Sequence, residues 1–196
     1  MRAIIAAILL ATPACFGATP GQPGFTLDQL MKSLAQRKHG EVTYVEEDYL
    51  AILDRPVKSS GVLVYDAPDR LEKRTLKPKA QSLLLQGDDL TVQRGHRKYR
   101  LQVSAYPQVA PLVAAMRDTL AGNEAGLERV FKVGFTGSEE NWKLQLAPLD
   151  KAARKVSRVE IAGTHDEIRS VEILQVGGDR SVMTLGQAAD TPGAAR

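Results

Sequence analysis

The stretch from Pro56 to Pro78 constrains the fold of this chain more than any other segment. After turn-forming residues at 59–61, the side chains alternate, with Leu63 and Tyr65 on one side and Val62 and Val64 on the other. Such alternation is typical of a β-strand, and apolar residues on both sides predict a strand covered on both faces.

A second strand follows at once. Pro68 cannot donate a hydrogen bond to a sheet and disfavours a helical conformation at Ala67, so the first strand must end there. Apolar alternation resumes over 71–76 and stops at Pro78. Two strands joined by a short Pro-Asp turn predict a β-hairpin. Segments with similar alternation and intervening turns predict nine further strands, at 41–49, 81–86, 90–94, 98–105, 131–135, 142–146, 156–162, 168–176 and 181–185.

Only a few segments have helical periodicity. Thr26 and Gln29 have the spacing of a capping box, and an apolar stripe containing Leu30 and Leu34 predicts a helix that runs to Lys38. A second stripe, which includes Leu112, Met116 and Leu120, predicts a helix over 111–121. A short helix at 124–129 and a single helical turn at 149–154 complete the expected set.

The hairpin also carries a family resemblance. Its pattern S-x-G-x-L-x-Y-x-x-P-x-x-L-x-x-x-T-x-x-P resembles the first long hairpin of LolA-type periplasmic lipoprotein carriers, and most of all a divergent LolA-like branch. The matching residues are Ser59, Gly61, Leu63, Tyr65, Pro68, Leu71, Thr75 and Pro78, followed by Gly87, Asp88, Leu90 and Val92 in a G-D-x-L-x-V pattern.

Strand pattern and resemblance together lead to one fold. A strongly bent antiparallel sheet must have its concave face covered, and the two amphipathic helices are the available cover. We therefore expect a mainly β (α+β) fold, an open, strongly curved antiparallel half-barrel of about eleven strands with a helical lid over a hydrophobic cavity. The resemblance implies this architecture more firmly than the periodicity does.

The first residues predict export. Arg2 precedes an apolar run from Ala3 to Ala11, followed by small residues, which is typical of a secretory signal peptide. We expect a signal peptide at 1–17, a flexible leader at 18–24, the LolA-like lipid-carrier domain at 25–186 and a disordered tail at 187–196. The expected location is a bacterial periplasm.

Cys15 is the only cysteine in the chain. It is either the last part of a discarded signal or an acylated N-terminal residue, in which case the protein is an outer-membrane lipoprotein. Thr12 stands where a bacterial lipidation site normally has leucine, which favours the first alternative. Both alternatives exclude a disulfide framework.

A hydrophobic cavity in an exported protein points to acyl chains as the ligand. The candidate wall residues are those with apolar side chains on the alternating strands, and the candidate lid residues are those on the two helical stripes. The walls are Leu63, Tyr65, Leu71, Leu83, Leu85, Leu101, Val103, Trp142 and Leu144, and the lid is Leu30, Leu34, Leu112, Met116 and Leu120. The alternative for each of them is an ordinary place in the core.

The resemblance fails at one position. LolA-type carriers have an arginine immediately before the hairpin proline, where it lies inside the cavity and hydrogen-bonds to the lid. Here Ala67 occupies that position, next to Asp66. The sequence therefore predicts a different cargo or a lid that is held by other means.

Other classes of function have little support in the sequence. The 26 basic and 23 acidic residues are interspersed, which disfavours nucleic-acid binding. The three histidines, His39, His96 and His165, show no metal-ligand spacing, and no nucleophile motif or phosphate-binding loop is found. We expect no catalytic residue, no metal and no cofactor.

Three functions remain open. The first is a monomeric periplasmic carrier of lipoproteins or other acylated lipids from the inner to the outer membrane. For this one, the resemblance implies an inner-membrane lipoprotein-releasing transporter and an outer-membrane receptor as partners. The second is an outer-membrane-anchored lipid acceptor of the same fold, and the third is a lipid-sensing interaction module that does not transport.

Overall fold

The strands of this protein are short, regular and joined mostly by tight turns. The computed structural model describes residues 24–107, 110–150 and 155–188. The strands in the first half of the chain are β1 (His39–Tyr49), β2 (Val57–Asp66), β3 (Arg70–Lys77), β4 (Gln81–Gln86), β5 (Asp89–Arg94) and β6 (Arg97–Gln102). Those in the second half are β7 (Phe131–Ser138), β8 (Asn141–Pro148), β9 (Val156–Thr164), β10 (Glu167–Gln175) and β11 (Arg180–Ala188).

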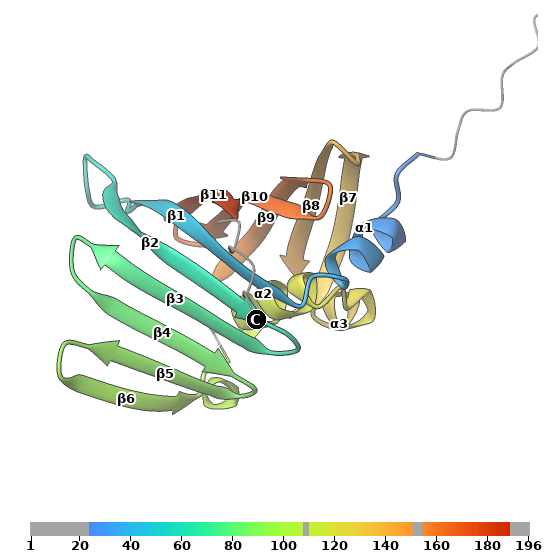
Figure 1. Cartoon of the computed structure of the whole chain (residues 1–196). Coiled ribbons are helices and arrows are strands. Elements are labelled where there is room, and N and C mark those ends of the chain that lie inside the picture. The colour runs from blue at the N-terminus through green and yellow to red at the C-terminus, as the bar shows by residue number, and fades with distance from the viewer. Residues whose placement is uncertain (1–23, 108–109, 151–154, 189–196) are drawn as a thin grey trace, which may run out of the picture.

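Within the described residues, all eleven strands belong to one antiparallel sheet in the order β6-β5-β4-β3-β2-β1-β11-β10-β9-β8-β7. The two halves of the chain each form a meander, and they meet where β1 pairs with β11. Because β6 and β7 stand at opposite ends of this order, the sheet does not close into a barrel. Figure 1 shows the sheet curling around the helices.

The helices lie on one face of the sheet, which we call the inner face (Figure 1). They are α1 (Leu27–Leu34), the 3-10 helix η1 (Val103–Ala105), α2 (Ala110–Leu120) and α3 (Glu124–Val130). The last three connect β6 to β7, so this part of the chain crosses the inner face from one edge of the sheet to the other. The expected open, curved, mainly β fold with helices on one face is confirmed.

The core lies between the helices and the second half of the sheet. Leu30 of α1, Ala115 of α2 and Leu127 of α3 are fully buried, and so are Trp142 and Leu144 of β8. Burial of such side chains contributes roughly 1.5–3 kcal/mol each, which is what fixes three short helices that would not be stable alone in water. The inner face of β3–β6 contributes only Leu85 to the buried apolar residues.

Several local expectations are confirmed. β2 and β3 form the expected hairpin, in which Tyr65 pairs with Leu71. The capping box of α1 is present, with the hydroxyl of Thr26 accepting from the backbone N–H of Gln29. The short third helix also forms, as α3.

Other expectations need correction. The first helix ends at Leu34 rather than Lys38, and a turn follows it. The strand expected over 98–105 ends at Gln102, because Asp88 accepts hydrogen bonds from Val103 N and Ser104 N and draws the chain into η1.

The two-sided cover expected for β2 is also incomplete. On its second face Val64 is buried, at 4% exposed, whereas Val62 is only half-buried.

Parts of the predicted organisation fall outside the described residues. They are the signal peptide at 1–17, the leader at 18–24 except Gly24, and residues 151–154 of the expected helical turn. Of the tail predicted at 187–196, Gln187 and Ala188 form the end of β11, and the rest is not described.

Candidate functional site

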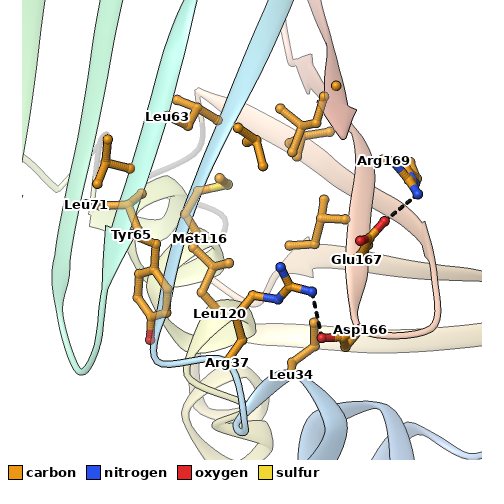
Figure 2. A pocket seen from close by; sticks show the side chains of 17 residues that line it. Leu34, Arg37, Leu63, Tyr65, Leu71, Met116, Leu120, Asp166, Glu167 and Arg169 are labelled. Atoms are coloured by element: carbon orange, nitrogen blue, oxygen red, sulfur yellow. Dashed lines mark hydrogen bonds and ion pairs between the residues drawn. The ribbon is translucent and has the colours of Figure 1, made fainter. Parts of the chain in front are cut away.

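A cavity of about 90 Å³ lies between the helices and the middle of the inner face. Figure 2 shows the side chains that line it. It is placed where the two halves of the sheet meet, since its walls come from β1, β2 and β3 on one side and from β10 and β11 on the other. The lining residues are Leu34, Arg37, Gly40, Val42, Leu63, Val64, Tyr65, Leu71, Met116, Leu120, Asp166, Glu167, Ile168, Arg169, Val171, Leu185 and Gly186.

Most of this wall is aliphatic, and the strand register explains why. Leu63 pairs with Val42, and Tyr65 pairs with Leu71, so these four side chains lie side by side on the inner face. Burial raises the pKa of the Tyr65 phenol, with Asp69 adding a smaller effect in the same direction. The phenol therefore stays neutral at physiological pH and adds no charge to the cavity.

Helix α2 closes the cavity on the side away from the sheet. Met116 and Leu120 point from it toward the strands (Figure 2). Both are only half-buried, whereas Ala115, next to Met116, is fully buried in the core. One side of α2 is thus fixed by core packing, while the side that faces the cavity is only half-buried.

Charged side chains occupy one end of the cavity. Arg37, in the segment after α1, donates to Asp166 in the turn between β9 and β10, with Nη2 2.7 Å from Oδ2. Glu167 and Arg169 at the start of β10 form a second ion pair beside the first. Figure 2 shows that the side chain of Arg37 extends into the cavity next to Leu120.

The guanidinium of Arg37 is only partly satisfied. Among the described residues, its Nε is one of two buried side-chain polar atoms that have no hydrogen-bond partner, the other being Thr119 Oγ1. A buried N–H without an acceptor is destabilising by about 1–3 kcal/mol and is uncommon in native proteins.

The volume of the cavity limits what it can hold in this conformation. A water molecule needs about 10–15 Å³ on this measure, so the cavity has room for roughly six to nine waters or a similar number of methylene groups. A whole long acyl chain would need more space than that.

On the inner face, the residues that lie beyond Val42 and Leu63, away from the charged end of the cavity, are polar. Tyr44 hydroxyl and Thr75 Oγ1 are 2.7 Å apart, and Lys73 Nζ lies 5.0 Å from the centre of the Tyr44 ring. Lys73 also pairs with Glu46, which accepts from Ser59. This polar cluster separates the cavity from the end of the sheet where β1 turns into β2.

The predicted site residues divide into two groups. Leu63, Tyr65 and Leu71 of the expected walls line the cavity, with Leu34, Met116 and Leu120 of the expected lid. The others lie elsewhere: Leu83, Leu85 and Leu101 farther along the sheet toward β6, Trp142, Leu144 and Leu30 in the core, Leu112 packed against the core, and Val103 in η1.

The charged residues of the cavity were not among the predicted site residues. Arg37 follows a helix and Asp166 lies in a turn, and both are positions where a solvated charge is the usual outcome. Only the fold brings them together across 129 positions of sequence. Ala67, by contrast, does not line the cavity, and its backbone N–H donates to Lys38 O at 2.8 Å in the turn between β2 and β3.

A second hollow, of about 500 Å³, lies between η1, α2 and the turn between β4 and β5. Polar and charged residues, including Asp88, Ser104 and Arg117, form part of its lining. Although it is larger, it is more open to solvent than the first cavity.

The described residues contain no cluster of His, Cys, Asp or Glu side chains suited to a metal ion. No helix among them is both long enough and apolar enough to cross a lipid bilayer.

Comparison with known proteins gives one family match. A protein-family model described as outer membrane lipoprotein carrier protein LolA-like matches residues 20–196. The comparison with curated proteins found no match.

Solved structures of similar fold have low sequence identity to this chain. A LolA superfamily protein from Nitrosomonas europaea is 13% identical, with a TM-score of 0.45 over 86% of this chain and 96% of its own. A putative outer membrane lipoprotein-sorting protein domain from Vibrio parahaemolyticus is 12% identical, with a TM-score of 0.45 over 88% and 94%. The lipoprotein LppX from Mycobacterium tuberculosis is 13% identical, with a TM-score of 0.41 over 86% and 98%.

Proposed function

The chain belongs to the family of LolA-like outer membrane lipoprotein carrier proteins, and we propose that it is a periplasmic carrier of acylated cargo. In this proposal the cavity binds the acyl chains of lipoproteins or related lipids, and the protein carries them from the inner to the outer membrane. The observation that carries the proposal is the aliphatic cavity enclosed between α2 and the inner face of β1–β3.

The energetics of acyl transfer fit such a cavity. Each methylene group that leaves water gains roughly 0.8 kcal/mol, so a long chain resists crossing an aqueous compartment by something on the order of 10 kcal/mol. An aliphatic wall offers that stabilisation without directional bonds along the chain, so the cargo can slide in and out.

A cavity of about 90 Å³ requires that the protein open for a full chain. In our proposal α2 moves away from the sheet, because the strands of the opposite wall are held to one another by backbone hydrogen bonds. Methionine adapts its side chain to irregular surfaces more readily than branched residues do, which suits a wall that repacks around different chains.

The proposed location and partners come from the family and from the expected signal peptide. An exported carrier would receive cargo from an inner-membrane lipoprotein-releasing transporter and deliver it to an outer-membrane receptor. Acylation of Cys15 would instead make the protein an anchored acceptor, and mass spectrometry of the mature N-terminus distinguishes the two. A protein that binds lipid but never removes it from a donor membrane would be the lipid-sensing module.

The test is lipid capture followed by transfer. Protein purified from its native compartment is examined by native mass spectrometry for a co-purifying lipid, and then incubated with donor and acceptor vesicles that carry a diacylated lipopeptide. We expect a bound acylated molecule and protein-dependent transfer. Absence of both would overturn the proposal.

A matched pair of variants links the result to the cavity. Leu63→Trp fills the cavity and should block transfer, whereas Leu101→Trp places the same bulk on the sheet outside the cavity and should leave transfer intact. Equal transfer by the two variants would show that the cavity is not the cargo site.

A further inference from the structure

We propose that Arg37 binds the carbonyl oxygen of a neutral acyl group, an ester or an amide, through its Nε–H. This inference rests on the proposed function, because it requires that an acyl chain occupy the cavity. It adds a recognised chemical group to a cavity whose other walls are aliphatic.

The unpartnered donor is the first observation. Nη2 of Arg37 is used by Asp166, but the buried Nε has no acceptor among the described residues. An unpaired buried donor is destabilising. A ligand oxygen that accepts from Nε–H forms the missing hydrogen bond, and this bond strengthens binding of the ligand. The arginine side chain lines the cavity next to Leu34 and Leu120 (Figure 2). Nε is covered in this conformation, so an acceptor reaches it when the cavity opens for an acyl chain, and that acceptor belongs to the molecule inside the cavity.

The charge of this end of the cavity decides which acceptor fits. Arg37 is paired with Asp166, and Arg169 with Glu167, so the two positive and two negative groups balance. A carboxylate placed there would add an uncompensated negative charge next to Asp166 and Glu167, and desolvating that charge is unfavourable. An ester or amide carbonyl accepts from Nε without disturbing either ion pair.

This arrangement would set the position of the cargo as well as its class. The carbonyl lies where the head of a fatty acyl group joins its chain. With the carbonyl at Arg37, the hydrocarbon extends over Leu63, Tyr65 and Leu71, and the head group lies toward the turn that carries Asp166. The structure therefore assigns free fatty acids to the weaker ligands and acyl esters or amides to the stronger ones.

The test measures displacement of diphenylhexatriene, an apolar fluorophore without hydrogen-bond acceptors, from the full-length protein. Three competitors share a sixteen-carbon chain: methyl palmitate, palmitate and hexadecane. For the unaltered protein we expect methyl palmitate to displace the fluorophore at a concentration about tenfold or more below that of hexadecane, the size expected for one hydrogen bond to a charged donor. Palmitate should compete less well than the ester.

Two variants test the role of Arg37 itself. Arg37→Lys keeps the positive charge for Asp166 but lacks Nε–H, and Arg37→Met removes every donor while keeping an apolar stem. Both should lose the preference for the ester over hexadecane and still bind hexadecane. The control Arg180→Lys changes an arginine outside the cavity, which pairs with Glu172, and should keep the preference.

The outcomes separate this inference from the proposed function. A preference for the ester that survives in both Arg37 variants, or palmitate that outcompetes the ester, overturns the role of Arg37 while leaving the carrier proposal intact. If neither diphenylhexatriene nor hexadecane binds to the unaltered protein, the cavity does not accept acyl chains and the carrier proposal fails as well.

Discussion

Arg37 Nη2 lies 2.7 Å from Asp166 Oδ2, and this contact joins the segment after α1 to the turn between β9 and β10. The two residues belong to the opposite ends of the described chain, and the cavity lies beside them. The ion pair is therefore placed to hold the segment after α1 against the turn between β9 and β10 at one end of the cavity.

Asp166→Asn should weaken this connection. Because the two side chains are 27% and 39% exposed, we expect the free energy of unfolding to fall by no more than about 1 kcal/mol. The rate of lipid transfer between vesicles should rise more clearly, since the charged end of the cavity is then held less firmly. Urea denaturation and the vesicle assay measure the two effects. The control Asp28→Asn removes an exposed ion pair with Lys32 on α1 and should leave transfer unchanged.

Ala67→Arg tests whether the hairpin position used by LolA-type carriers has a role here. The Ala67 backbone lies in the turn between β2 and β3 and does not line the cavity. We expect lipid release at the rate of the unaltered protein, measured by transfer to acceptor vesicles. Slower release would show that an arginine at this turn can still reach the helices.

Gly61→Ala should destabilise the central hairpin. A Cβ atom at Gly61 would lie 1.9 Å from Arg74 O on the neighbouring strand, so β2 and β3 would have to separate. We expect a loss of about 1–3 kcal/mol in the free energy of unfolding, as for other overpacked sites. Gly134→Ala is the matched control, since a Cβ there meets nothing closer than 3.7 Å. It should stabilise the fold by about 0.4–1 kcal/mol. A comparable loss in both variants would contradict the close approach at Gly61.

Glu72 should make stability depend on pH in the acid range. Hydrogen bonds from Arg74, 2.8 Å and 2.9 Å long, hold the pKa of this carboxyl below its usual value of 4.5, with smaller help from Arg70 and Ser82. A carboxyl whose pKa is lowered by folding stabilises the protein above its unfolded pKa, and the contribution is lost as the pH falls through the folded value.

The measurement for Glu72 is urea denaturation of the unaltered protein and Glu72→Gln at pH 7 and pH 3. We expect the difference in unfolding free energy between them to be larger at pH 7 and to shrink at pH 3. A difference that stays constant across this range would mean that Glu72 does not titrate with folding. Arg74→Met should reduce the pH dependence in the same way, because it removes the main partner.

Local patterns were sufficient for the elements that make the fold. The alternation around Leu63 and Tyr65, the turn at Pro68 and the capping box at Thr26 each act through neighbours within a few residues, so the sequence displays them directly. They predicted the hairpin, the start of α1 and the family. The end of β6 escaped this reasoning, because Asp88 determines it from a turn 15 residues before Val103.

The cavity depended on relationships that no local pattern contains. Leu63 and Trp142 both lie in strands whose apolar side chains alternate, yet one lines the cavity and the other is fully buried in the core. The difference arises because the helices pack on the second half of the sheet and leave space over β1–β3.

The sequence by itself determined the order of strands and helices and the side chains that each strand presents to either face, since these follow from short-range sterics and alternation. Only the tertiary structure decided where the helices rest on the inner face, which apolar side chains remain around a cavity, and that Arg37 meets Asp166 beside it. Those outcomes depend on how the volumes and charges of distant segments fit together, and that fit is settled when the two halves of the sheet join at β1 and β11.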